Sequence, residues 1–352
     1  MSNTISVASL DWSLAHHAQF GDTDLFPRLF EFDVIADHWK KVRTHLRKLD
    51  LQSHAWSPPR RVLVPKDPLI FRSGSQFDPI DSLLFAALIR ECGELIERRR
   101  ISVAHSKVFS SRFNPDESGQ LYSTGDHWGE FWKKSLHESS RPTCTHVVIC
   151  DIADFYQQIG HAGIQTQLEL ANVPVWCSAA IAALLRVSAG DVGRGLPVGP
   201  HASHLLAELS LIPLDNMLTD SYPNFCRFVD DIHVFCKSEA EAELALYDLA
   251  NVLDGTLHLW TSGRKTRLIE ADEFREMAKA NDRGDLSDEE ERILRIVQQA
   301  TGSPYTFASF DKLDEDDKKA FDRSIISDVL GDYLEAPEPD YAKLRWFLRR
   351  LA

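Results

Sequence analysis

The sequence predicts an α+β fold, an antiparallel sheet with helices packed on one face. The first observation is a set of short apolar runs of β type, one leading to Asp151 and two flanking the pair Asp230 and Asp231. The second is that longer segments between these runs carry apolar residues at helical spacing. The third is the order strand, helices, hairpin, helix and strand, which is typical of this architecture.

The first 144 residues are expected to combine helices and loops. Two segments have helical periodicity, a pair of prolines interrupts the pattern, and a polar stretch with two glycines comes later. We therefore expect helices at residues 39–49 and 81–99, a short strand at 60–65, and a loop at 113–132.

The sheet elements begin at residue 145. We expect a strand at 145–151, a helix at 164–185 interrupted at Pro174, a flexible glycine-rich loop at 190–199, a helix at 202–212, a hairpin at 225–236, a helix at 239–253 and a strand at 256–260. The chain becomes acidic and helical beyond residue 272. Its last helical pattern, at 341–352, has no C-cap, so the natural chain either continues or is truncated there.

The composition is that of a globular protein with a sizeable core. The chain has 352 residues, of which 43% are hydrophobic and 26% charged, which suits two or three subdomains. No apolar run approaches the ~20 residues of a membrane span, and the N-terminus lacks the features of a secretory signal. The six cysteines form no C-x-x-C pair, which favours a reduced, cytoplasmic protein over a disulfide scaffold or a zinc site.

The net charge of −14 is unevenly distributed. Residues 270–340 contain 21 acidic and 9 basic residues, so the rest of the chain carries only about −2. Residues 40–72 contain 9 basic residues against Asp50 and Asp67. Because screening limits the reach of distant charges to ~8–10 Å, this basic segment can bind phosphates on an acidic protein.

Carboxylates gather at the predicted sheet. Asp230 and Asp231 occupy the hairpin turn, and Asp151 closes the strand of residues 145–150. An isolated Asp pair is usually a turn feature. Three carboxylates on neighbouring strand ends, however, could hold two divalent ions about 3.5–4 Å apart, the arrangement used for nucleotidyl transfer.

Five ordered motifs between residues 60 and 273 resemble those of reverse transcriptases. Residues 150–156 resemble the first palm motif, 195–208 the second, 228–231 the third, 265–266 the fourth, and Pro65, Lys66 and Arg72 the fingers positions. Residues 11–12, 21–27 and 109–113, and Val198 in place of the usual Gln, resemble the bacterial abortive-infection and defence-associated (unknown-group) branch, which provides antiphage immunity. The resemblance implies a right-hand polymerase fold with fingers and palm, followed by a helical C-terminal region.

The resemblance also implies a division into three parts. Residues 1–144 would form the N-terminal region and fingers. Residues 145–275 would form the palm, with inserted fingers helices at about 160–200. Residues 276–352 would form an acidic, helical, thumb-like region.

Metal-binding roles follow from the resemblance and from carboxylate chemistry. Asp151 and Asp230 would bridge two Mg²⁺ ions, for which Mn²⁺ can substitute, with Asp231 beside them. The carbonyl of Ile152 would add an oxygen ligand. Lys265 would protonate the leaving pyrophosphate, although its motif is the weakest of the five.

Nucleotide contacts are expected from seven residues: Lys66, Arg72, Asp154, Phe155, Tyr156, Val198 and Gly199. The two cations would neutralise the β- and γ-phosphates, although either alone is more often a surface residue. Asp154 would offer its backbone N–H, or else act as a turn or cap residue. Tyr156 matches the steric gate that excludes a 2′-hydroxyl, with a core aromatic as the alternative.

Val198 stands where the family usually has Gln, and Gly199 follows it. Val198 cannot make the hydrogen bonds of the usual Gln, whereas the Gly199 backbone can still approach the nucleotide. Nucleotidyl transfer should therefore survive, while template reading is in question.

The leading hypothesis is an RNA-directed DNA polymerase that extends a primer 3′-hydroxyl with dNTPs. Its expected partners are a dedicated noncoding RNA as template and the DNA product. A partner protein or a homo-oligomer is left open, and no membrane is expected. The alternatives are template-independent or protein-primed DNA synthesis by the same site, a catalytically silent RNA- or protein-binding module, and a palm-fold nucleotide cyclase.

Overall fold

The computed structural model describes residues 4–21, 25–26, 28–67 and 70–283, together with Lys318 and Gly331. The expectations for the region beyond residue 283, including the acidic helical part and the C-terminal helix, lie outside the described residues. Of the described helices, none is long and apolar enough to cross a membrane.

A four-stranded antiparallel sheet forms the centre of the fold, with strand order β4-β5-β3-β6. The paired hairpin β4–β5 and the strand that ends at Asp151 are confirmed. Strand β6 lies further along the chain than the strand expected at residues 256–260. The bounds are β3 His146–Asp151, β4 Phe225–Phe228, β5 Asp231–Cys236 and β6 Arg267–Glu270.

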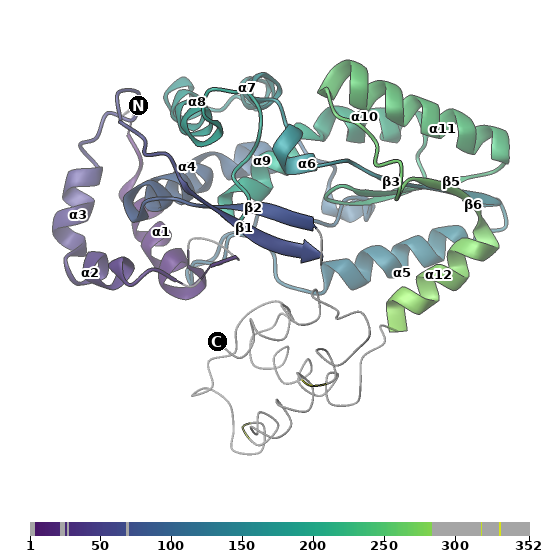
Figure 1. Cartoon of the computed structure of the whole chain (residues 1–352), viewed down its shortest axis with the longest axis horizontal. Coiled ribbons are helices and arrows are strands. Elements are labelled where there is room, and N and C mark those ends of the chain that lie inside the picture. The colour runs from purple at the N-terminus through teal and green to yellow at the C-terminus, as the bar shows by residue number, and fades with distance from the viewer. Residues whose placement is uncertain are drawn as a thin grey trace.

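Helices cover both faces of this sheet (Figure 1). Helix α11 (Glu239–Val252) packs on one face, and α5 (His127–Ser139) with α12 (Ala271–Arg283) packs on the other. In β3, Val148 joins the core beneath α11, whereas Val147 joins a second core that contains Phe131 and Phe274. The α+β class is thus confirmed, and the structure adds a second helical layer because β3 and β5 are buried on both sides.

Two expectations about local structure are wrong. Residues 256–260 are no strand, because a π-helical turn (Leu253–Leu257) ends at His258, which has φ of +55°. The alternating apolar pattern there reflects burial and not strand pairing, because Leu259 is buried in the core. Its N–H donates to the carbonyl of Leu253.

The expected loop at residues 113–132 ends earlier. Helix α5 begins directly after Asp126, whose carboxylate accepts the N–H of Gly129 as an N-cap. Its aromatic residues Phe131 and Trp132 are buried against the sheet. The N-cap followed by aromatics at helical spacing is the signal that the polar composition obscured.

The remaining helices surround the sheet and the N-terminal half. The predicted periodic segments at residues 39–49, 81–99, 164–185, 202–212 and 239–253 are all helical in the structure, with the break near Pro174. The bounds are α1 Val7–Phe20, α2 Glu31–Asp37, α3 Trp39–Leu46, α4 Pro79–Glu97, a 3₁₀ turn Val103–His105, α6 Phe155–Gln158, α7 His161–Leu170, α8 Val175–Ala189, α9 Ala202–Ser210 and α10 Ile212–Ser221.

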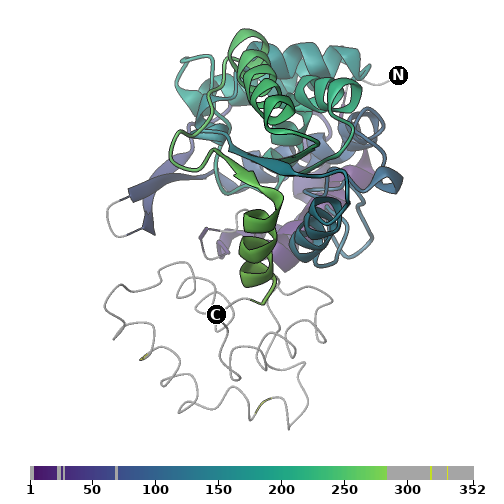
Figure 2. The same cartoon turned by 90° about the vertical axis from the view of Figure 1, so that its right-hand side faces the viewer.

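A separate two-stranded hairpin projects from the body of the molecule (Figure 2). It consists of β1 (Arg60–Asp67) and β2 (Ile70–Gln76), paired antiparallel. The sequence indicated only the first of these strands. Its base is tied to the body, because the N–H of Ser75 donates to the carbonyl of Val198 over 2.8 Å.

Candidate active site

The turn of the β4–β5 hairpin carries the adjacent carboxylates. Phe228 pairs with Asp231, so that Val229 and Asp230 form a two-residue connection. Val229 has a left-handed backbone, with φ of +53°, as tight hairpin turns require. Asp230 therefore lies on the turn itself, and Asp231 opens β5.

Asp151 lies directly opposite Asp231 in the register of β3 and β5. It is 6% exposed, whereas Asp230 and Asp231 are partly exposed. Like charges directly opposite each other destabilise a sheet, and residues so paired have Cβ atoms only about 4.5–5.5 Å apart. The ends of the two central strands and the adjoining turn thus carry Asp151, Asp231 and Asp230, and a nearby cation would relieve the repulsion between their charges.

Lys265 lies beside this group. Its ammonium nitrogen donates to Oδ1 of Asp151 over 2.8 Å. The hydrogen bond that Lys265 donates to Asp151, helped by the charges of Asp151, Asp231 and Asp230, raises the pKa of Lys265 above its usual value against the opposing effect of burial. The turn that carries Lys265 is held to the same strand, because the N–H of Ser262 donates to the carbonyl of Asp151.

A loop and a short helix border the carboxylates. Tyr156 is partly buried in α6, and its carbonyl accepts the N–H of Leu196 over 2.7 Å. In this way the loop between α8 and α9 is tied to the strand end that bears Asp151. Gly199 of the same loop has φ of +119°, a conformation that glycine adopts far more readily than other residues.

A comparison with protein families bears directly on this arrangement. Residues 96–277, slightly more than half of the chain, match the family described as reverse transcriptase (RNA-dependent DNA polymerase). The matched segment contains the three carboxylates, Lys265 and Tyr156. The chain belongs to the reverse transcriptase family.

Other comparisons show distant likeness. No curated protein matches the chain. Among solved structures, the reverse transcriptase is similar to a telomerase from Candida albicans in complex with a TWJ fragment of telomeric RNA, with 11% identity and a TM-score of 0.42. The match covers 69% of this chain and 48% of the telomerase, so the chain spans about half the length of that relative.

The site of this reverse transcriptase fits a hard divalent cation in donor chemistry. In the described part of the chain, no group of three His, Cys, Asp or Glu side chains is placed to ligate a metal ion. The strand register nevertheless places three Asp residues at neighbouring strand ends, and their carboxylates with the Lys265 ammonium carry a formal net charge of −2. Such oxygen donors are those that Mg²⁺ prefers.

The Ile152 carbonyl points within the sheet toward β5, the strand that begins with Asp231. Ile152 pairs with Thr261 as a bridge whose flanking hydrogen bonds run from Ala153 N–H to the Trp260 carbonyl and from Ser262 N–H to the Asp151 carbonyl. In such a pair the central residue directs its own N–H and C=O away from the partner. The carbonyl of Ile152 therefore points to the side on which β5 lies.

Residues 154–156 have three different environments. Asp154 is exposed, has φ of +47°, and its carbonyl accepts the N–H groups of Gln157 and Gln158. Phe155 is 3% exposed and belongs to the main core, so any nucleotide contact would come from its backbone. The hydroxyl of Tyr156 lies 2.6 Å from Nδ1 of His204 in α9.

The predicted phosphate-binding cations lie on the projecting hairpin. Lys66 belongs to β1 and Arg72 to β2, where Arg72 pairs with Val64 and is exposed. They therefore share one end of the hairpin. Val198 is partly buried in the loop between α8 and α9. Its carbonyl accepts the N–H of Ser75 and so connects this loop to β2.

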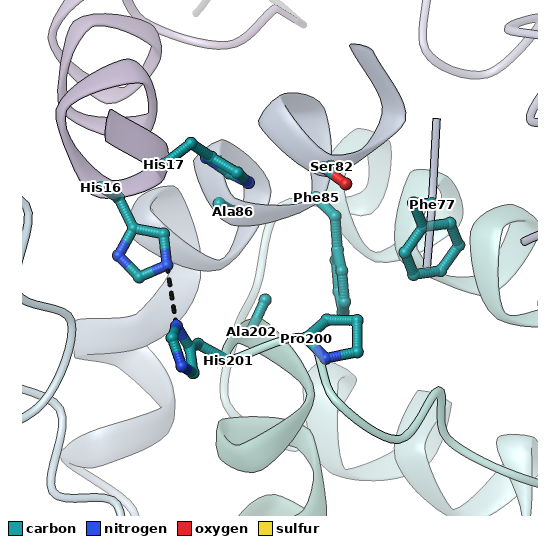
Figure 3. Close-up of a pocket in the computed structure, with 9 residues that line it drawn as sticks. All are labelled: His16, His17, Phe77, Ser82, Phe85, Ala86, Pro200, His201 and Ala202. Carbon is teal, nitrogen blue, oxygen red and sulfur yellow. Dashed lines mark hydrogen bonds between the residues drawn. The ribbon is translucent and has the colours of Figure 1, made fainter. Parts of the chain in front are cut away.

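A small histidine-lined cavity adjoins the second-motif loop (Figure 3). It encloses about 10 Å³, space for about one water molecule. His16 donates from Nδ1 to the carbonyl of Gly119, which leaves Nε2 as an acceptor for Nδ1–H of His201, 3.3 Å away. Burial first, then the neighbouring His201 and His17, lower the pKa of His16 well below its usual value, in keeping with this neutral form.

The sequence did not indicate a buried group of four charged residues and one serine behind the β4–β5 turn. Its members lie on five different segments and are at most 5% exposed: Arg100, Ser110, Glu208, Asp215 and Arg227. The one available signal was local, since Arg227 interrupts an apolar strand that is otherwise suited to full burial.

Proposed function

We propose that this chain is an RNA-directed DNA polymerase that transfers deoxynucleotides onto a primer 3′-hydroxyl with the help of two divalent ions. The observation that carries the proposal is the register of Asp151 opposite Asp231, with Asp230 on the adjoining turn. Membership of the reverse transcriptase family supports the reaction class.

Asp151 and Asp230 would hold both ions, with Asp231 and the Ile152 carbonyl as further oxygen ligands. When bound, two Mg²⁺ or Mn²⁺ ions activate the attacking hydroxyl and neutralise the triphosphate. Lys265 would give its proton to the departing pyrophosphate, since its ammonium already lies 2.8 Å from a metal-binding carboxylate.

The remaining expected contacts would select and align the nucleotide. Lys66 and Arg72 would contact the β- and γ-phosphates. Tyr156 would close the space beneath the sugar, so that a ribose 2′-hydroxyl is excluded. Asp154 would contribute its backbone N–H, and Gly199 would allow the chain to approach the nucleotide closely.

The proposed template is RNA, with a dedicated noncoding RNA as the expected one. Support comes from the exposed basic residues of α3 and the projecting hairpin, including Lys40, Lys41, Arg60 and Arg72. The second candidate is template-independent or protein-primed DNA synthesis. Val198 favours this alternative, because its side chain lacks the hydrogen-bonding groups of the usual Gln.

We further propose a cytoplasmic role in antiphage defence, with a partner protein or a second copy of the chain as open partners. The motifs that resemble the defence-associated branch support the role. All six cysteines are free thiols, which supports a reducing compartment. The role predicts that phage plating falls when the gene is expressed and recovers in the Asp230→Ala/Asp231→Ala variant.

The decisive experiment measures incorporation of labelled dNTPs by the purified protein with Mg²⁺ or Mn²⁺ and its co-purified nucleic acid. The Asp230→Ala/Asp231→Ala protein serves as the control. DNA made by the wild type alone supports the polymerase, and sequencing tells whether the product is complementary to a bound RNA. Random or homopolymeric DNA favours untemplated synthesis. RNA binding without any DNA synthesis, even with added primers and RNA, would overturn the proposal in favour of a binding module.

A further inference from the structure

The turn that carries Asp230 has an unfavourable backbone conformation. Val229, directly before it, has φ of +53°. A β-branched residue rarely adopts this conformation, and such strain persists only where the surroundings hold it in place. The contacts that hold Val229 therefore also determine where the Asp230 carboxylate points.

Side chains bind both polar groups of the Val229 backbone. Its N–H donates to Oγ of Ser110 over 2.9 Å, and its carbonyl accepts from Nη1 of Arg227 over 2.9 Å. Ser110 is 1% exposed and Arg227 is fully buried. Water therefore has little access to these two side chains and cannot easily replace either hydrogen bond to Val229.

Ser110 reaches the turn from a distant part of the chain. The segment of residues 107–109 runs parallel to β4 and pairs with it at Arg227. The N–H of Arg227 donates to the carbonyl of Lys107, and the N–H of Phe109 donates back to the carbonyl of Arg227. Because residues 107–109 lie alongside β4, the next residue, Ser110, reaches the Val229 N–H.

Glu208 of α9 joins the two groups that bind Val229. Its Oε1 accepts from Oγ of Ser110 over 2.5 Å. Its Oε2 accepts from Arg100 over 2.7 Å and from Arg227 over 3.0 Å. One buried carboxylate thus orients both the serine that binds the Val229 N–H and the arginine that binds its carbonyl.

The charges in this group balance. Arg227 binds Asp215 through two hydrogen bonds of 2.7 and 2.6 Å, so that two guanidiniums face two carboxylates. Burial disfavours the charged form of Glu208, but Arg227 and Arg100 outweigh it and hold the pKa of Glu208 below its usual value. The carboxylate is therefore ionised and accepts all three bonds.

We propose that Ser110 and Glu208 are positioning residues that aim Asp230 through the backbone of Val229 and so set the metal affinity of the site. The inference rests on the proposed function, because it takes Asp230 to be a metal ligand. It assigns a role to two buried polar residues that are not among the expected nucleotide or metal ligands.

The test is metal binding by the Ser110→Ala variant, which removes one hydroxyl and leaves every charge in place. Binding of Mn²⁺ is measured by electron paramagnetic resonance without nucleotide. Loss of a residue that orients a ligand typically weakens metal affinity 10- to 100-fold, so we expect about a tenfold weaker affinity. DNA synthesis should fall at low Mn²⁺ and recover at high Mn²⁺.

Ser13→Ala is the matched control. Ser13 is also fully buried, and its hydroxyl donates to the carbonyl of Leu83, 70 residues away, over 2.7 Å. This variant should lower the unfolding midpoint but leave Mn²⁺ affinity within about twofold, since it touches no group that orients a metal ligand. A Glu208→Gln variant that folds should weaken Mn²⁺ binding further than Ser110→Ala.

Unchanged Mn²⁺ affinity in Ser110→Ala would overturn the inference, even if the protein is destabilised. The outcome is separable from that of the proposed function. A wild type that binds Mn²⁺ through Asp230 but makes no DNA would overturn the polymerase, while the comparison of Mn²⁺ affinities would still decide the role of Ser110.

Discussion

His204 and Glu208 lie four residues apart on α9, and each contacts a different part of the site. Nδ1 of His204 is 2.6 Å from the hydroxyl of Tyr156, and Oε1 of Glu208 is 2.5 Å from Oγ of Ser110. Residues at this spacing share one face of a helix. Helix α9 thus connects the expected steric gate to the turn that carries Asp230.

The contact with His204 leads to a prediction about sugar selection. His204→Ala removes a hydrogen bond that fixes the Tyr156 ring, and such bonds contribute about 0.5–1.5 kcal/mol. We expect discrimination against ribonucleotides to fall up to about tenfold, because the loosened ring excludes the 2′-hydroxyl less well. The kcat/KM ratio for dNTP over rNTP measures this.

Variants of the tyrosine itself complete that test. Tyr156→Phe should produce a similar partial loss, the double variant should add little to it, and Tyr156→Ala should admit ribonucleotides. Tyr222→Phe is the matched control, because it removes a hydroxyl bonded to Asp248, outside the expected gate. If Tyr156→Ala leaves sugar selectivity unchanged, Tyr156 is not the steric gate. If Tyr156→Ala loses selectivity but His204→Ala keeps it, the gate does not depend on the hydrogen bond to His204.

Lys265 is predicted to have two separable effects. Its Nζ lies 2.8 Å from Asp151, but the side chain as a whole is more than half exposed, so its charge should weaken metal binding only a few-fold. Lys265→Ala should therefore bind Mn²⁺ slightly more tightly, yet extend primers about 10²-fold more slowly because the general acid is lost. Single-turnover incorporation and Mn²⁺ titration measure the two effects.

Lys265→Arg separates charge from proton transfer. Arginine keeps the positive charge but does not release its proton at accessible pH. Metal affinity should return to the wild-type value while incorporation stays slow. A fast Lys265→Arg enzyme would mean that Lys265 acts only as a counter-ion of Asp151.

Buried histidines predict that the fold loses stability in mild acid. Burial lowers the pKa of His17 from 6.5 to about 4, despite the bond from its Nδ1–H to the Ser13 carbonyl; His201 and Arg28 lower it further. The unfolded chain binds this proton below about pH 6.5, whereas the folded chain binds it only below about pH 4. Stability should therefore fall as pH decreases from 6.5, by about 2 kcal/mol at a pH of about 5 from His17 alone.

The His17→Phe variant isolates this contribution. Phenylalanine keeps a ring against Phe32, whose centroid lies 4.8 Å from that of His17, but cannot take up a proton. Urea unfolding at pH 7.5 and about pH 5 should show a smaller difference in the variant than in the wild type. Equal differences would mean that His17 is not the group that titrates.

Local patterns in the sequence were sufficient for the strand ends and the hairpin. The alternation around residues 225–236 and the adjacent Asp230 and Asp231 predicted the turn, because hairpin geometry depends on a few neighbouring residues. The same reasoning failed at residues 256–260, where alternating burial without strand pairing looked like a strand. It also missed α5, whose polar composition hid the Asp126 cap.

The partners of the site residues could not be read from local patterns. Ser110 and Glu208 are 98 residues apart, and Lys265 and Asp151 are 114 apart. Each contact depends on how loops and helices pack around the sheet. The motif containing Lys265 was the weakest in the sequence, yet the structure brings its ammonium directly to a carboxylate of the site.

The sequence by itself determined the α+β class, the order of the motifs and the three carboxylates, because periodicity and turn chemistry act over a few residues. Only the tertiary structure decided that Asp151 faces Asp231, that Tyr156 is bonded to His204, and that buried charges hold Val229. These depend on strand register and on balanced charges from distant segments, which become neighbours only when the chain folds.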